Sequence, residues 1–312
     1  MVVEYLMLIA GIILLIKGAN WLINGATSLG EKLKISGFLI GMTIVAFGTS
    51  LPELVVSLMA SAKDSGGIIL GNIIGSNISN LLLILGLVSL FFPIKLSKPA
   101  VNKDLFFSIL ATFFLFFIAI FVGFIDRSIG LIFLLLFFMF FYYRFKYSAK
   151  QSFSFGRIAN HQVTLKNIFL IILGSVSLFI GAKLTVSGAI TISQSLNLSQ
   201  FLISATVIAI GTSLPELITS IQALRKNKGK MAVGNIIGSN IFNILWVLGF
   251  VSLSKPIELP ITFNLDIIFL LFVSIIFFVS MFVGEKYRIS RKKAISFLLL
   301  YLAYIVFIVV RG

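Results

Sequence analysis

The sequence contains no cysteine and a single histidine, His161, among its 312 residues. The lack of cysteine excludes disulfide bonds and metal sites built on thiolates. Zinc and copper bind best to sulfur and nitrogen ligands, which this chain scarcely provides. Charged residues are also scarce, at 11% of the chain. A soluble domain of this length would carry more charge to hydrate its surface, so the composition argues against one.

Hydrophobic residues make up 59% of the chain, and the mean hydropathy is +1.13. Apolar runs recur throughout, for example at 105–123, 129–145 and 267–283. A helix needs about 20 apolar residues to cross the roughly 30 Å hydrocarbon layer of a bilayer. The first apolar segment has no basic residue before Lys17 and no small-residue cleavage site, so we expect a membrane helix there rather than a signal peptide. The composition therefore predicts an integral membrane protein surrounded by lipid.

Two motifs occur twice in the sequence. GTSLPE occupies residues 48–53 and 211–216, and GNIIGSN occupies residues 71–77 and 234–240. Both pairs are offset by 163 residues, which indicates an internal duplication. We place the first repeat at 1–146 (motif regions 48–53 and 71–80), a linker at 147–165, and the second repeat at 166–312 (motif regions 211–216 and 234–243).

Each repeat divides into five segments long enough to span a bilayer. They lie at 4–23, 37–62, 68–92, 105–124 and 128–146, and at 166–190, 200–224, 230–253, 265–284 and 292–310. Because five is odd, the second repeat must insert upside down relative to the first. The expected fold is an all-α integral membrane protein with ten transmembrane helices in two inverted five-helix repeats. Such repeats are typical of secondary transporters, which bind ions at broken helices near the midplane.

The net charge of +15 fits this topology. Only Lys63, Arg127, Lys255 and Arg311 fall on one side of the predicted membrane, whereas most other basic residues fall on the side of the linker. Cytoplasmic loops collect Lys and Arg. We therefore expect a cytoplasmic linker and extracellular termini in the cell membrane, and we do not expect binding to nucleic acid.

Two of the ten acidic residues, Glu53 and Glu216, lie deep within hydrophobic segments. A charged group at the centre of a membrane helix costs about 2.5–3.5 kcal/mol on insertion scales. A chain that accepts this cost twice, at equivalent repeat positions, is expected to use both carboxylates. The alternative is a pair of protonated glutamates that only hold helices together.

The hexamer around each glutamate predicts a broken helix. Pro52 lacks an N–H and crowds the carbonyl of Gly48, so the helix should break there. Thr49 and Ser50 precede Glu53 by four and three residues, which places their hydroxyls on its face. Gly211, Thr212, Ser213, Pro215 and Glu216 repeat the pattern.

The second motif supplies more oxygen ligands one helix later. Asn72, Ser76 and Asn80 form a stripe at intervals of four residues, and Asn235, Ser239 and Asn243 repeat it. Each stripe is accompanied by a GxxxG pattern, which favours close helix packing. Helix packing and hydrogen bonding alone would be the other explanation of these residues.

Oxygen ligands suit hard cations such as Ca²⁺ and Na⁺. Two carboxylates balance one Ca²⁺ or about two Na⁺, and mutually exclusive occupancy of one pocket is the basis of exchange. The residues therefore predict a cation antiporter, a transporter rather than an enzyme, and leave Na⁺, H⁺ and K⁺ open as the counter-ion.

The duplicated GTSLPE and GNIIGSN motifs resemble the alpha repeats of the calcium/cation antiporter superfamily, in its prokaryotic sodium/calcium exchanger branch. The resemblance covers nearly the whole chain and implies Na⁺/Ca²⁺ exchange by a monomer without a cofactor. It also implies a pathway formed by the second, third, seventh and eighth helices, across which the first and sixth helices slide.

By this resemblance, Glu53 and Glu216 match the calcium-binding carboxylates, assisted by the carbonyls of Thr49 and Thr212. Further matches are the sodium-site hydroxyls of Ser50, Ser76, Ser213 and Ser239, the outer-site carbonyls of Ala46 and Ala209, and the central amides of Asn80 and Asn243.

At residue 243 the chain departs from several prokaryotic and all potassium-dependent members, which have Asp where it has Asn. This departure argues against potassium dependence. Calcium/proton exchange remains the nearest alternative, because two buried glutamates could carry protons. A channel would use similar ligands without needing a counter-ion. An intramembrane hydrolase is disfavoured, because His161 lies in the linker and cannot activate a serine in the membrane.

Overall fold

The computed structural model describes residues 2–33, 35–152, 165–195 and 211–311. The first half contains α1 (Val2–Lys32), α2 (Gly37–Ile40), η1 (Gly41–Val45), α3 (Ala46–Thr49), α4 (Leu51–Ala62), α5 (Gly66–Ile78), η2 (Ser79–Ile84), α6 (Leu85–Phe91), η3 (Ala100–Leu105), α7 (Phe106–Phe121) and α8 (Arg127–Ser152). The second half contains α9 (Leu165–Ser195), α12 (Leu214–Arg225), α13 (Gly229–Ile241), η5 (Phe242–Val247), α14 (Leu248–Ser254), η6 (Ile261–Phe263), α15 (Asn264–Ser280) and α16 (Arg291–Arg311).

The described residues form eight helices long and apolar enough to cross a membrane, and one bent pair, Gly37–Thr49 with Leu51–Ala62, forms a ninth. The predicted segment 200–224 is described only from Gly211 onward, as α12, and its beginning lies outside the described residues. The predicted membrane-spanning helical fold is confirmed, while the tenth helix stays a prediction.

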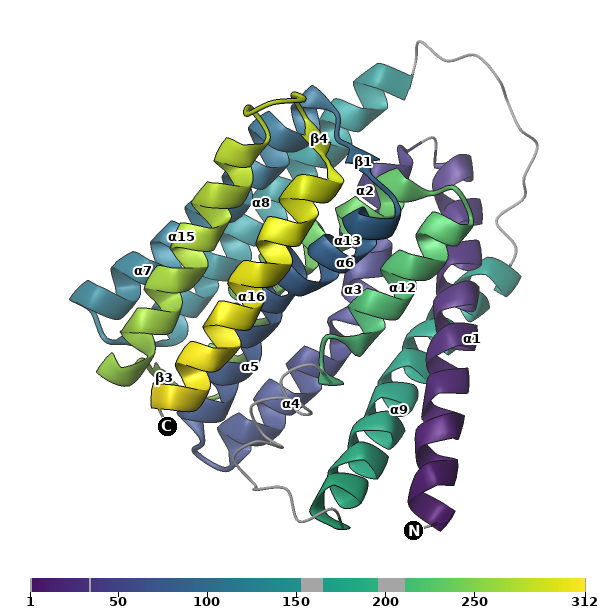
Figure 1. Cartoon of the computed structure of the whole chain (residues 1–312). Helices are drawn as coiled ribbons and strands as arrows, with labels where there is room; N and C mark the ends of the chain where they lie inside the picture. The colour runs from purple at the N-terminus through teal and green to yellow at the C-terminus, as the bar shows by residue number, and fades with distance from the viewer. Residues whose placement is uncertain (1, 34, 153–164, 196–210, 312) are drawn as a thin grey trace.

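The helices α1 and α9 open the two halves and pack antiparallel on one side of the molecule (Figure 1). Gly11 lies against Gly181, and Gly18 lies against Gly174, so residue numbers rise along one helix as they fall along the other. A Cβ atom added to Gly18 would lie 2.9 Å from the carbonyl oxygen of Gly174. Such close backbone contact requires small residues. Equivalent helices of the two halves thus run in opposite directions, as inverted repeats require.

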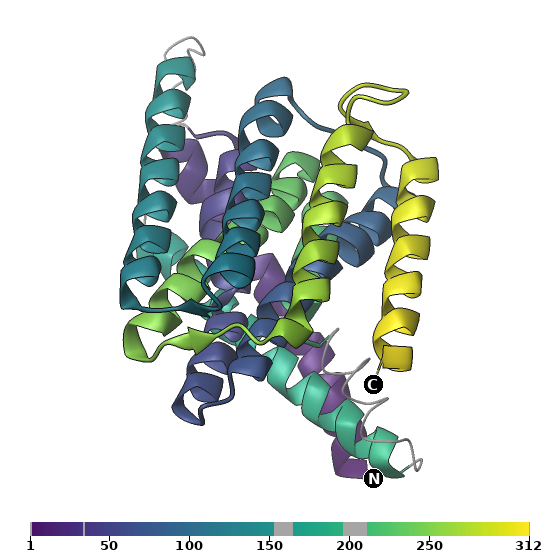
Figure 2. The same cartoon turned by 90° about the vertical axis from the view of Figure 1, so that its left-hand side faces the viewer.

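The spans 66–91 and 229–254 form the centre of the molecule. Their most apolar stretches are 78% and 83% buried, compared with 22–44% in the other uninterrupted spans. Figure 2 shows α7, α8, α15 and α16 as a row of upright helices that covers this centre. Gly234 and Gly238 of α13 pack against the backbone of Phe38 and Met42, which confirms the predicted close approach for the second GxxxG pattern.

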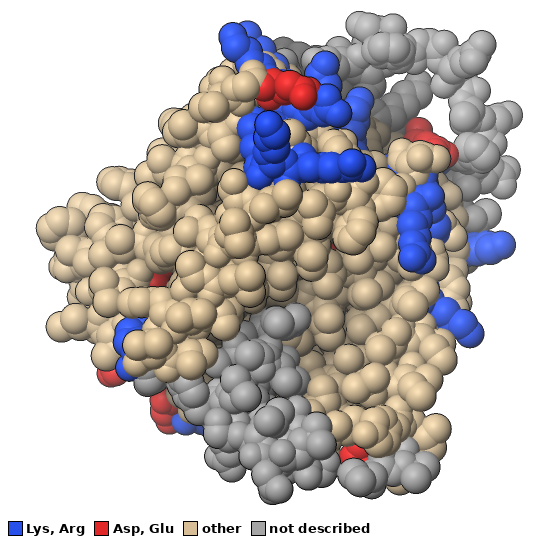
Figure 3. Space-filling model, in the orientation of Figure 1, with Lys and Arg blue, Asp and Glu red and all other residues tan. Residues whose placement is uncertain are grey.

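Two small antiparallel sheets join the halves at opposite ends of the molecule (Figure 1). At one end β1 (Ile94–Lys95) pairs with β4 (Arg288–Ile289), and at the other β2 (Phe124–Ile125) pairs with β3 (Ile257–Glu258). These strands were not predicted, because two residues are too few to show a strand pattern. Lys and Arg gather at the β1–β4 end (Figure 3), whereas the start of α1 and the end of α16 lie at the other end (Figure 1).

Candidate cation site

The predicted helix breaks are present in both halves. Helix α3 ends at Thr49, Ser50 leaves the helical region (φ −87°, ψ 4°), and α4 resumes with a bend of 41°. Ser213 has nearly the same conformation (φ −86°, ψ 1°) before α12. Pro52 and Pro215 occupy the first turns of the new helices, where a missing N–H costs nothing. Each break places a glutamate in a helix's first turn, where the dipole favours a negative charge.

Both glutamates are buried, at 0% and 1% exposure, and each is linked through a serine to the opposite repeat. Ser76 Oγ donates to Glu53 Oε1 at 3.4 Å and lies 3.4 Å from Thr212 Oγ1. Correspondingly, Ser239 Oγ donates to Glu216 Oε1 at 3.3 Å and lies 3.4 Å from Thr49 Oγ1. The two motif pairs therefore converge on one place.

Four asparagines form a reciprocal network across the two halves. Asn80 Nδ2 donates to Asn240 Oδ1 at 2.9 Å, and Asn243 Nδ2 donates to Asn77 Oδ1 at 3.1 Å. Asn77 and Asn240 each donate in turn to the other's backbone carbonyl, at 3.5 and 3.4 Å. Asn80 and Asn243 lie in the π-helices η2 and η5, a backbone form common at functional sites. The network occupies the side-chain nitrogens of Asn80 and Asn243 and thereby fixes the orientation of both amide groups. Their side-chain oxygens remain free of hydrogen bonds from the described residues.

A symmetric set of buried oxygens lacks hydrogen-bond partners among the described residues. The set consists of Glu53 Oε2 and Glu216 Oε2, Ser50 Oγ and Ser213 Oγ, and Asn80 Oδ1 and Asn243 Oδ1. Buried polar atoms are nearly always satisfied, so orphaned ones call for a ligand or water. Three matched pairs of electron-rich atoms are the donor set that a hard cation requires.

The remaining predicted residues are placed as follows. Ala46 is buried, and its carbonyl accepts hydrogen bonds from the Ser50 N–H at 2.9 Å and the Thr49 hydroxyl at 3.3 Å. Ala209 and His161 lie outside the described residues. Asn72 does not present a free amide nitrogen, because this atom donates to the Glu53 carbonyl oxygen at 3.0 Å and to Ser57 Oγ at 3.1 Å.

Sequence reasoning missed four residues that support the site, namely Asn77 and Asn240 in the network and Ser57 and Ser220 behind the motif asparagines. Asn235 Nδ2 donates to Ser220 Oγ at 3.4 Å, as Asn72 does to Ser57. The signal was available, because Asn77 and Asn240 close the two copies of GNIIGSN and Ser57 and Ser220 share the repeat offset.

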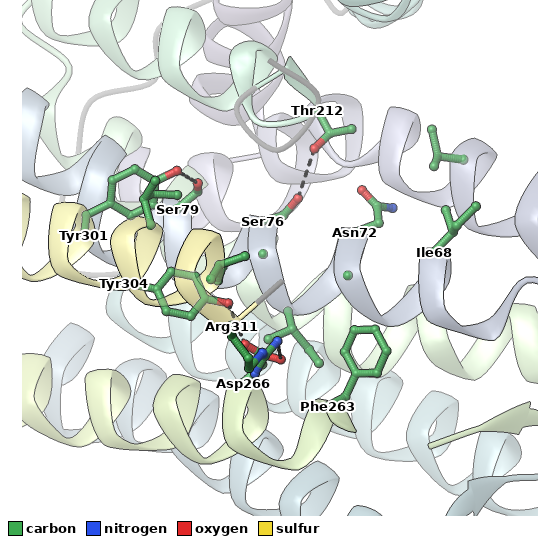
Figure 4. A pocket seen from close by; sticks show the side chains of 16 residues that line it. Ile68, Asn72, Ser76, Ser79, Thr212, Phe263, Asp266, Tyr301, Tyr304 and Arg311 are labelled. Atoms are coloured by element: carbon green, nitrogen blue, oxygen red, sulfur yellow. Dashed lines mark hydrogen bonds and ion pairs between the residues drawn. The ribbon is translucent and has the colours of Figure 1, made fainter. Parts of the chain in front are cut away.

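A cavity of about 370 Å³ adjoins the site (Figure 4). Ser76 and Thr212 lie on one side of it, and Asp266, Tyr304 and Arg311 lie across from them. The cavity follows α5 and η2 from Ile68 to Ser79, a distance of about 16 Å at 1.5 Å per residue. It therefore connects the serine–threonine side of the site with the end of the molecule where α16 ends.

Known proteins resemble this chain over nearly its whole length. A family model described as sodium/calcium exchanger protein matches residues 3–146 and 166–310. The sodium/calcium exchanger MaX1 of Methanosarcina acetivorans is 30% identical, over 97% of this chain and 98% of the relative. The inner membrane protein YrbG of Escherichia coli is 35% identical, over 87% of this chain and 86% of the relative.

Among solved structures, the sodium-calcium exchanger NCX_Mj, soaked with Na⁺ and Ca²⁺, superposes with a TM-score of 0.82 at 32% identity, covering 98% of both chains. The motifs, the inverted helices and the converging glutamates thus occur together in a multi-pass membrane protein that belongs to the sodium/calcium exchanger family.

Proposed function

We propose that this protein is a secondary active transporter that exchanges Na⁺ for Ca²⁺ across the membrane. The observation that carries the proposal is the symmetric set of orphaned oxygens around Glu53 and Glu216. Two carboxylates neutralise one Ca²⁺, and the serine and asparagine oxygens help to complete the six to eight ligands that Ca²⁺ takes. The family relationship and the names of MaX1 and NCX_Mj support the same ion pair.

Exchange follows from the charge balance of the pocket. An empty pocket with two buried carboxylates is costly to move through a low-dielectric barrier, whereas a filled pocket is neutral. Ca²⁺ and Na⁺ compete for the same carboxylates, so one ion must leave before the other binds. The hydroxyls and carbonyls offer ligands for Na⁺ beyond the two ions that the carboxylates balance, so we propose that exchange is electrogenic. Asn243, where potassium-dependent members have Asp, favours exchange that is independent of K⁺.

We propose the following roles for the site residues. Glu53, Glu216 and the carbonyls of Thr49 and Thr212 bind Ca²⁺. Na⁺ binds to the hydroxyls of Ser50, Ser76, Ser213 and Ser239. It also binds to the backbone carbonyls of Ala46 and Ala209. The amides of Asn80 and Asn243 face the central position. The paired helices α1 and α9, joined by close glycine contacts, are suited to move together and alternate access.

The distribution of charge supports an orientation. Lys and Arg gather at the β1–β4 end, so we propose that this end faces the cytoplasm and that both termini are extracellular in the cell membrane (Figure 3). A C-terminal tag should then react with impermeant reagents from outside intact cells. A tag that reacts only after the cells are opened would contradict this orientation.

The function is tested by calcium-45 uptake into proteoliposomes of the purified protein, loaded with Na⁺, with K⁺ or with an acidic buffer. We expect uptake with internal Na⁺ and none with K⁺ alone. Uptake driven only by the proton gradient would instead identify a calcium/proton antiporter. Uptake that ignores all three gradients would identify a channel.

A further inference from the structure

An ion pair outside the site faces the cavity that leads to it. Arg311 NH2 donates to Asp266 Oδ2 at 2.8 Å, and the hydroxyl of Tyr304 donates to Asp266 Oδ1 at 3.2 Å. The Asp266 side chain is only 5% exposed, whereas that of Arg311 is 34% exposed. All three residues line the cavity opposite Ser76 and Thr212 (Figure 4).

The first half has a corresponding ion pair. Asp104, in η3 before α7, accepts a hydrogen bond from Arg144 of α8 at 3.0 Å, with side-chain exposures of 0% and 9%. Asp266, in the first turn of α15, and Arg311, in the last turn of α16, join the equivalent two helices of the second half. Both pairs join neighbouring outer helices. A role in joining helices accounts for the buried pair Asp104–Arg144. It does not require the second pair to line a cavity with an arginine side chain that is one-third exposed.

One side of the cavity is lined with polar side chains that could conduct a cation. Asn72, Ser76 and Ser79 follow one face of the α5–η2 helix from the outer end toward the site, and Thr212 faces Ser76 at 3.4 Å. A carboxylate in a narrow, low-dielectric cleft focuses the field and concentrates cations. Among the described residues that line this cavity, Asp266 supplies the carboxylate.

We propose that Asp266 is an outer cation-binding station on the route from the β2–β3 end of the molecule to the site, and that Arg311 holds it closed until a cation arrives. This inference rests on the proposed exchange function. A cation that approaches Asp266 replaces the guanidinium of Arg311, whose side chain is about one-third exposed and lies 5.3 Å from the ring of Phe307. The cation then passes along the serine side chains to Glu53. Tyr304 positions the carboxylate through its hydrogen bond.

The first test measures Ca²⁺ uptake into Na⁺-loaded vesicles of opposite sidedness. In Asp266→Asn, the KM for Ca²⁺ presented at the β2–β3 face should rise about threefold to tenfold, while Vmax and the KM at the other face stay unchanged. In Arg311→Gln, the KM at the β2–β3 face should fall, because the carboxylate is no longer neutralised. Asp126→Asn is the matched control, since Asp126 lies at the same end and caps α8 through the N–H of Ile129. An unchanged KM at the β2–β3 face in Asp266→Asn would overturn the proposal.

A second test does not depend on transport. The chain has no cysteine, so a single one can be introduced at Ile308, which lines the cavity. A cationic thiol reagent should react there faster than an anionic one, and Asp266→Asn should reduce this ratio several-fold, while Asp126→Asn leaves it unchanged. A cysteine at Leu302, which is 59% exposed on the outer face of α16, should resist both reagents in the bilayer. No reaction at residue 308 would show that lipid rather than water fills the cavity, and a ratio that ignores Asp266 would show that this carboxylate does not attract cations. Either result would overturn the proposal.

The two tests separate the inference from the function beneath it. If wild-type vesicles show no Na⁺-driven uptake, the proposed function fails, and the reagent ratio still decides whether Asp266 attracts cations into the cavity. If the wild type exchanges ions but Asp266→Asn matches it in KM at both faces, only the outer station is wrong.

Discussion

The two halves of this protein are nearly identical at its centre and different at its ends. At the centre, the Ser76–Glu53 and Ser239–Glu216 contacts measure 3.4 and 3.3 Å, and the orphaned oxygens come in matched pairs. At the ends, the turns after α4 and α12 keep the same shape, with Asp64 and Asn227 at positive φ (55° and 58°), a conformation that Asp and Asn tolerate. Their contacts, however, have diverged.

The turn after α4 forms an exposed ion pair between Asp64 and Lys255 at 2.8 Å. In the turn after α12, Lys226 instead donates to Asn24 of α1 at 2.9 Å and Lys228 donates to Thr27 at 2.6 Å. Burial lowers the pKa of both lysines. In the proposed exchange the central residues bind the same ions from either side, whereas each turn faces one side only. Duplicated chemistry is therefore retained where both halves share a task.

The largest expected effect comes from removing a carboxylate at the centre. Glu53→Gln and Glu216→Gln should each reduce Na⁺-driven Ca²⁺ uptake about 100-fold or more, because an unbalanced charge in a low-dielectric site costs about 3–5 kcal/mol. Uptake into proteoliposomes measures this, with the exposed Glu31→Gln as the control. Near-normal flux in either variant would exclude that glutamate from the site and break the equivalence of the halves.

The next effect concerns the closed ion pair of the first half. Asp104→Asn should destabilise the protein by about 3–5 kcal/mol, because it leaves Arg144 as a buried charge without its carboxylate. Thermal unfolding in detergent measures the loss. Asp266→Asn should cost less, since Arg311 is 34% exposed and can turn to solvent. Equal losses would mean that both pairs serve only to join helices.

The asparagine network tests the equivalence of the halves more finely. Asn77→Ala leaves the Asn243 amide without its acceptor, and Asn240→Ala does the same to Asn80. An unsatisfied buried group costs about 1–3 kcal/mol, so we expect Vmax to fall about tenfold in both variants. Ser89→Ala, at another buried polar site, should transport normally. A defect in only one asparagine variant would show that the central position is asymmetric.

The sequence was sufficient to predict the inverted fold and the burial of Glu53 and Glu216, because exact duplication and charge within apolar segments are visible without a structure. Asn77 and Asn240 escaped notice because the stripe of Asn72, Ser76 and Asn80 selects one helix face, whereas Asn77 reaches across to the other repeat. Contacts between residues so far apart in the chain have no local pattern. The ion pair Asp266–Arg311 was also missed because its two residues lie far apart in the chain. Each residue alone looks like the polar end of a membrane helix.

The smallest effect is expected at the exposed ends. Lys255→Ala removes the ion pair with Asp64, whose side chains are 48% and 77% exposed. Solvent-exposed pairs contribute about 0.2–1 kcal/mol, and salt screens them further. Lys255→Ala should therefore unfold within a few degrees of the wild type in detergent and transport normally, and the small difference should shrink as salt is raised. A loss comparable to that of Asp104→Asn would mean that this turn takes part in conformational change, and the contrast between centre and ends would have to be redrawn.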